Sequence, residues 1–151
     1  MIYRLAFGWI FTATLVAAAY LIGTMPVAAA EPDADSPELV CQVRYASETR
    51  LLHQSATTDP YSAATVDFDN RFRFRAVVLG SPGRINHITL TVYELAESTK
   101  EAPPVIIHQV RYQAPFNMNN EIPALTGWNH VYANYRGREL RYGCALKAVQ
   151  S

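Results

Sequence analysis

The stretch TVDFDNRFRFRAVVL, Thr65 to Leu79, decides the fold of this chain. Its apolar and charged residues alternate with a period of two, which is typical of a β-strand with one buried and one solvated face. The sequence therefore predicts one half-buried strand whose polar face carries a row of arginines. The apolar set is Val66, Phe68, Phe72, Phe74, Ala76 and Val78, and the charged set is Asp67, Asp69, Arg71, Arg73 and Arg75.

Similar alternation recurs on both sides of this stretch, separated by turn-rich segments such as Gly80-Ser81-Pro82-Gly83. No segment after residue 30 has the period of a long helix. The pattern predicts an all-β fold, an antiparallel β-sandwich of about seven strands, with a small β-barrel as the alternative. The further expected strands are residues 39–47, 49–55, 85–95 and 105–112 and a hairpin over 128–149.

The hydrophobic pattern also predicts the pairing within two hairpins. A turn of three or five residues after the 65–79 stretch places Phe72 and Phe74 opposite apolar residues around Leu90, and the arginines opposite polar ones. A two-residue turn at Arg136-Gly137 pairs Val131 with Tyr142 and places Tyr132 beside Arg141. Both pairings keep the apolar residues of each hairpin on one face.

The first 30 residues form a separate, apolar segment in which Arg4 is the only charged residue. Pro26 breaks it, and Ala28 and Ala30 have the small-residue spacing of a signal-peptidase site, which predicts a cleaved signal peptide over residues 1–30. The alternative is an uncleaved membrane anchor through residues 5–22, about the minimum length for a span. We expect a secreted or periplasmic protein, with membrane contact only if this helix is retained.

Composition narrows the function of the remaining chain. Residues 31–38 are acidic and proline-rich and predict a disordered lead-in, which leaves residues 39–151 as one domain. The chain has 13 basic and 13 acidic residues. Such a balance argues against nucleic acid as a partner, because nucleic-acid binding needs a basic excess or stripe.

The two cysteines, Cys41 and Cys144, lie near the two ends of the predicted domain. In an oxidising compartment they are expected to form one disulfide between the first and last strands. Neither belongs to a CxxC motif. The sequence therefore favours a structural bridge over a reactive thiol or a metal site.

No catalytic motif stands out, and neither a metal nor a cofactor is expected. The four histidines lie on four different candidate strands, without HxH or HExxH spacing. Asp67, Asp69 and Asn70 lack the clustering of a calcium loop. A small secreted hydrolase with a loop-assembled site is the enzymatic alternative, with His87 and Asp69 as its base and orienting group.

Two surfaces are candidate binding sites. Guanidinium forks bind carboxylates and phosphates, and aromatic residues beside arginine have the composition of an interface hot spot. The sequence favours a non-enzymatic, exported domain that binds an envelope protein or an anionic surface ligand. A structural subunit of an envelope assembly is a further alternative. The first surface is Arg71, Arg73 and Arg75, and the second is Trp128, Tyr132 and Arg141.

The segment Gln113 to Gly127 has no sustained period and is long for a loop in a compact domain. It is interpreted either as a crossover between sheets, with a short helical turn near Asn119, or as a binding loop. In the first case the 128–141 surface lies partly under it as a second packed layer.

Overall fold

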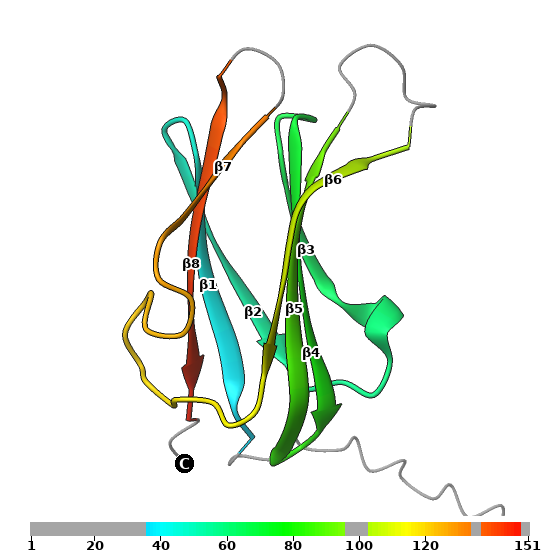
Figure 1. Ribbon diagram of the computed structural model, residues 1–151, viewed down its shortest axis with the longest axis vertical. Coiled ribbons are helices and arrows are strands. Elements are labelled where there is room, and N and C mark those ends of the chain that lie inside the picture. The colour runs from blue at the N-terminus through cyan, green and yellow to red at the C-terminus, as the bar shows by residue number, and fades with distance from the viewer. Residues whose placement is uncertain (1–35, 96–102, 134–136, 149–151) are drawn as a thin grey trace, which may run out of the picture. The chain divides into compact units, whose positions relative to one another are not determined.

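A computed structural model describes residues 36–95, 103–133 and 137–148, which form eight β-strands and one 3-10 turn (Figure 1). The strands form two antiparallel sheets of four, which confirms the all-β prediction with one strand more than the seven expected. The predicted signal peptide lies outside the described residues, as does the lead-in up to residue 35. Glu38, expected in the lead-in, is the first residue of β1. No helix in the described part of the chain is long and apolar enough to span a membrane.

Sheet A has the strand order β2-β1-β8-β7. Its strands are β1 (Glu38–Tyr45), β2 (Glu48–Ser55), β7 (Asn129–Tyr132) and β8 (Glu139–Lys147). Sheet B has the order β3-β4-β5-β6, with β3 (Ala64–Phe68), β4 (Phe72–Ser81), β5 (Arg84–Glu94) and β6 (Val105–Gln113). Among these strands none pairs with a strand of the other sheet, so the arrangement is sandwich-like.

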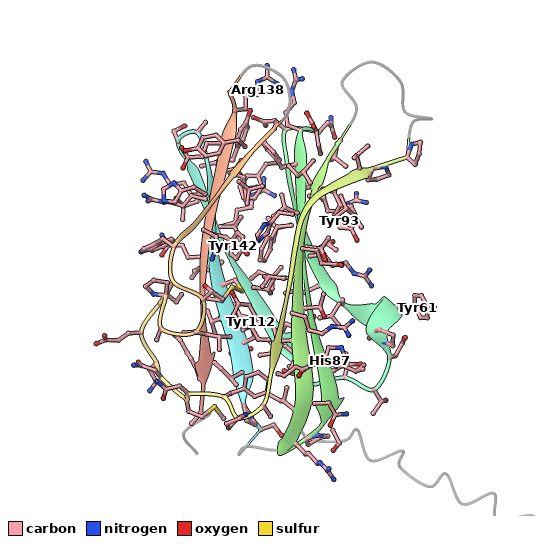
Figure 2. The ribbon with its side chains drawn as sticks, in the orientation of Figure 1. Tyr61, His87, Tyr93, Tyr112, Arg138 and Tyr142 are labelled. Atoms are coloured by element: carbon pink, nitrogen blue, oxygen red, sulfur yellow. A yellow bond between two sulfur atoms is a disulfide. The ribbon has the colours of Figure 1, made fainter. Side chains whose placement is uncertain are left out.

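The core lies between the two sheets and contains side chains from both. The Phe74 ring of β4 lies 5.0 Å from the Tyr142 ring of β8, and Figure 2 shows Tyr142 between the layers. Burying one such aromatic side chain contributes about 1.5–3 kcal/mol. The largest fully buried side chains are Tyr142, Phe68, Phe72, Phe74, Leu39, Ile88, Leu90, Leu140, Leu146, Val43, Val78 and Val92.

The predicted disulfide is confirmed. Cys41 on β1 and Cys144 on β8 are bonded, are directly opposite in the register, and are both fully buried in the core. The backbone N–H and C=O of Cys144 bond to Thr126 and Leu125 rather than to β1. The bridge therefore joins the first and last strands at a non-hydrogen-bonded position of the ladder, where cross-strand side chains approach most closely.

The prediction of one strand over residues 65–79 is wrong. A three-residue turn, residues 69–71, divides the stretch into β3 and β4, and Phe68 pairs directly with Phe72. Asp69 and Asn70 have φ of 45° and 52°, a left-handed conformation that Asp and Asn tolerate better than most residues. Because the turn has an odd number of residues, the apolar alternation passes through it without changing phase.

The β4–β5 hairpin has the predicted faces but not the predicted turn. Its loop is the two-residue Pro82-Gly83, and a bulge between Leu79 and Gly80 shifts the register by one residue. The bulge restores the parity that an odd turn would give, so Phe74 lies opposite Val92. The pairing predicted for Phe72 is wrong, because Phe72 lies opposite Glu94 and Ala76 lies opposite Leu90. Glycine is required at position 80, because a Cβ there would clash with the backbone carbonyl of Arg84.

In the C-terminal hairpin the faces are again as predicted and the pairing is shifted by two residues. Val131 pairs with Leu140, not with Tyr142, and Tyr132 pairs with Glu139, not with Arg141. Part of its turn lies in residues 134–136, outside the described residues.

The segment between β6 and β7 runs along the edge of β8 beyond Tyr142, the residue of β8 that pairs with the first residue of β7. Asn119 N–H donates to the Leu146 carbonyl, and Leu125 N–H to that of Cys144, so the loop continues the pairing of this edge without forming a strand. Its hydrogen-bonded turns lie within residues 121–127, where Ala124 N–H donates to the Glu121 carbonyl and Gly127 N–H to the Pro123 carbonyl. The segment joins β6 of sheet B to β7 of sheet A, as the crossover interpretation expected, but the predicted helical turn near Asn119 is not formed, and the turns lie just after that residue.

Candidate binding surface

The first predicted surface, the arginine row, begins in the β3–β4 turn and continues on β4. Arg71 directly precedes β4, and its carbonyl accepts from Leu95 N–H, which extends the β4–β5 pairing by one residue. Arg73 and Arg75 lie on one face of β4 and pair with Tyr93 and Thr91, as the sequence indicated.

Both strand arginines are engaged within the domain. Arg73 makes a two-pronged bond to Asp67, with Nε to Oδ1 and Nη2 to Oδ2 both at 2.7 Å. This bond holds the pKa of Asp67 below its usual range and raises the pKa of Arg73. Arg75 Nη2 donates to the carbonyl of Pro60 at 2.5 Å. The two side chains line a hollow of about 330 Å³ beside Tyr61, where Arg73 Nε and Nη2 and Arg75 Nη2 already have partners.

The second predicted surface lies on the outer face of sheet A. A Cβ at Gly143 would lie 2.6 Å from Pro123 Cβ and 3.0 Å from Trp128 Cε3, so the indole and the loop rest directly on this glycine. The Arg141 guanidinium, two residues along β8, stacks on the indole with Cζ 4.9 Å from the ring centroid. Trp128 is nevertheless 41% exposed. The loop therefore forms a packed layer that presents this aromatic side chain to solvent.

Tyr132 extends the same face along β7 and is 58% exposed. It lies opposite Glu139, whose carboxylate bonds to the Nδ1 atom of His130. His130 in turn lies opposite Arg141. The pairing of Glu139 with histidine leaves the guanidinium of Arg141 without an ion pair among the described residues.

Arg44 of β1, which the sequence did not suggest, belongs to this surface. It lies directly opposite Arg141 in the β1–β8 register, and both line a hollow of about 550 Å³. Figure 2 shows Arg138, a third lining residue, directly before the first residue of β8. The expected disulfide could have predicted the position of Arg44, because antiparallel pairing of Cys41 with Cys144 also places residue 44 opposite residue 141.

We define the aromatic–arginine surface as Trp128, Tyr132, Arg141 and Arg44. Its two aromatic side chains are exposed, and its two arginines lie side by side on neighbouring strands. Like charges directly opposite each other in a sheet destabilise the pairing. The surface thus combines the aromatic and arginine anchors of interfaces with excess positive charge.

The proposed hydrolase pair is wrong in its geometry. Asp69 lies in the turn before Phe72, whereas His87 pairs with Leu79 near the far end of β4. At about 3.3 Å per residue, these positions are roughly 20 Å apart, beyond the reach of a hydrogen bond. No group of three or more metal-ligating side chains occurs within residues 36–95, 103–133 and 137–148.

One histidine is half-buried and bonds to a core residue. His108 of β6 lies with Nε2 2.8 Å from the hydroxyl of Tyr142. Burial lowers the pKa of His108 and raises that of Tyr142, so both are neutral near pH 7 and share one hydrogen bond. This pair links β6 of sheet B to the buried Tyr142 of sheet A and is not part of either candidate surface.

Comparisons with known proteins gave no relatives: no family model, no curated protein and no solved structure matches this chain. The candidate surface is therefore defined by its own geometry.

Proposed function

We propose that the chain is an exported, non-enzymatic domain that binds a protein partner in the cell envelope through the aromatic–arginine surface. Export is supported by the apolar segment up to residue 30 and by the buried disulfide, a bond that persists in oxidising compartments. Binding is supported by one observation above all. Two exposed aromatic side chains lie on the same sheet face as two adjacent arginines that make no ion pair with a described residue.

The two predicted surfaces differ in whether their arginine side chains already form ion pairs within the domain. On sheet B, Arg73 forms an ion pair with Asp67 and Arg75 Nη2 donates to the Pro60 carbonyl, so a ligand of Arg73 would have to displace an ion pair. On sheet A, Arg141 Nε is buried and has no hydrogen-bond partner within the described residues. The guanidinium groups of Arg141 and Arg44 form no ion pair with a described residue, so a ligand carboxylate would displace none there.

The test is capture of partners by tagged full-length protein, crosslinked in the source cells and identified by mass spectrometry. Trp128→Ala with Tyr132→Ala should lower recovery of the principal partner by about tenfold or more, because truncating aromatic hot-spot residues weakens binding by at least about 2 kcal/mol. Tyr61→Ala is the matched control, since Tyr61 is 89% exposed on the sheet B side. Equal recovery by all three proteins would reject the surface.

A further inference from the structure

The geometry points to the chemistry of the partner: we infer that Arg44 and Arg141 bind a carboxylate group of an acidic protein segment. This inference rests on the proposed function and assigns a charge to the group that the surface recognises. It starts from the register of β1 and β8, which places the two arginines directly opposite each other on the outer face of sheet A. They occupy a hydrogen-bonded position of the ladder, three residues from the disulfide pair, where Cα atoms are about 5.5 Å apart.

The hollow beside this pair has the charge of an anion site. Arg44 and Arg141 both line it, and the one carboxylate among its lining residues, that of Glu139, is bonded to His130. Arg44 Nε makes a long 3.4 Å contact to the carbonyl of Ala46, which leaves its terminal nitrogens for a ligand. An anion between Arg44 and Arg141 would offset their repulsion and accept from both forks.

The neighbouring side chains favour a protein carboxylate. Trp128 holds the Arg141 guanidinium against its ring, with Cζ 4.9 Å from the ring centroid, and planar guanidinium forks match carboxylates bidentately. Trp128 and Tyr132 then offer exposed aromatic area on either side for apolar residues flanking an Asp or Glu. Arginine together with tryptophan and tyrosine is the composition of protein interface hot spots.

The stacked indole also provides the readout. In full-length Trp9→Phe protein Trp128 is the only tryptophan, so its fluorescence reports on Arg141 directly. The probe is succinate, titrated against sodium chloride of equal ionic strength. We expect a saturable change with succinate and none with chloride. Arg44→Gln and Arg141→Gln should each weaken it by about tenfold or more, because each removes one charged fork.

Arg84→Gln is the matched control, an exposed arginine at the start of β5 that should leave the succinate titration unchanged. No saturable response, or an unchanged response in Arg44→Gln, would overturn the inference. Inorganic phosphate binding about tenfold more tightly than succinate would also overturn it, in favour of a phosphate ligand.

Partner capture separates this inference from the proposed function. Loss of capture in both the aromatic double variant and Arg44→Gln supports both proposals. Loss in the aromatic variant alone leaves the proposed function standing and rejects the carboxylate. Unchanged capture in every variant rejects the proposed function itself.

Discussion

Replacing Gly143 with alanine tests whether the loop and Trp128 rest on β8 as described. The new Cβ would lie 2.6 Å from Pro123 Cβ and 3.0 and 3.1 Å from two indole carbons. Ordinary van der Waals contact begins near 3.4 Å, so the Pro123 side chain must retreat by about 0.8 Å. Overpacking of this kind destabilises by about 1–3 kcal/mol, and the entropy that alanine removes from the unfolded chain offsets about 0.4–1 kcal/mol. We therefore expect a net loss of roughly 1–2 kcal/mol.

The assay is urea unfolding of full-length Trp9→Phe protein, followed by circular dichroism and by Trp128 fluorescence. Gly143→Ala should lower the unfolding midpoint and change the emission of the folded state, because the indole must move. Gly83→Ala is the control: Gly83 has a φ of 76° and no neighbour within 4 Å of its Cβ position, so it should lose stability without changing emission. A Gly143→Ala protein with the parental midpoint and emission would refute the packing of the loop on β8.

Three further predictions concern stability. Replacing Cys41 and Cys144 together by alanine should lower the free energy of unfolding by up to about 4–5 kcal/mol in the chain-entropy model, measured by urea unfolding; a change below about 1 kcal/mol would contradict it. Since burial lowers the pKa of His108, the unfolded chain binds its proton first, and stability should fall as the pH drops from about 6.5 towards the lowered pKa. His108→Gln should flatten this part of a plot of melting temperature against pH, and an unchanged slope would count against the buried pair. Asp67→Asn removes the two-pronged bond to Arg73. The Asp67 carboxylate stabilises the fold fully above its ordinary pKa near 3.8, and this stabilisation is lost as the pH falls through the lowered pKa of Asp67 in the folded state. As the pair is half-exposed, the loss at pH 7 should stay below about 1 kcal/mol and shrink in high salt; a salt-independent loss would disprove the ion-pair account.

The sequence pattern predicted the faces of the strands correctly and their pairing only in part. A period of two determines which side chains share a face, but any register shift of two residues preserves it. Val131 accordingly lies on the expected face while pairing with Leu140 instead of Tyr142. The β4–β5 hairpin reaches the expected faces through an even turn and a bulge, a combination that the apolar pattern cannot distinguish from an odd turn.

The turn inside the opening stretch was missed for the same reason. Three turn residues between Phe68 and Phe72 leave the alternation intact, so only residue type marks the break. Asp69-Asn70 is that mark, because these side chains favour turns and tolerate positive φ. The turn also brings Asp67 of β3 opposite Arg73 of β4, where its carboxylate bonds the guanidinium.

The second surface was predicted better because its residues are close in sequence. Trp128, Tyr132 and Arg141 belong to one hairpin and its entry, so local alternation places them on one face. Arg44 comes from the other end of the domain, and no local pattern connects it to Arg141. Only the long-range constraint of the disulfide places these two arginines together.

The central claim is that the aromatic–arginine surface contacts a partner, and site-specific photo-crosslinking in the source cells tests it most directly. A photoreactive phenylalanine analogue placed at Tyr132, 58% exposed on sheet A, should give one dominant crosslinked protein, and Arg44→Gln should reduce its yield. The same analogue at Tyr61, 89% exposed on the sheet B side, should not give that product. Crosslinking to the same protein from Tyr61 and not from Tyr132 would contradict the account.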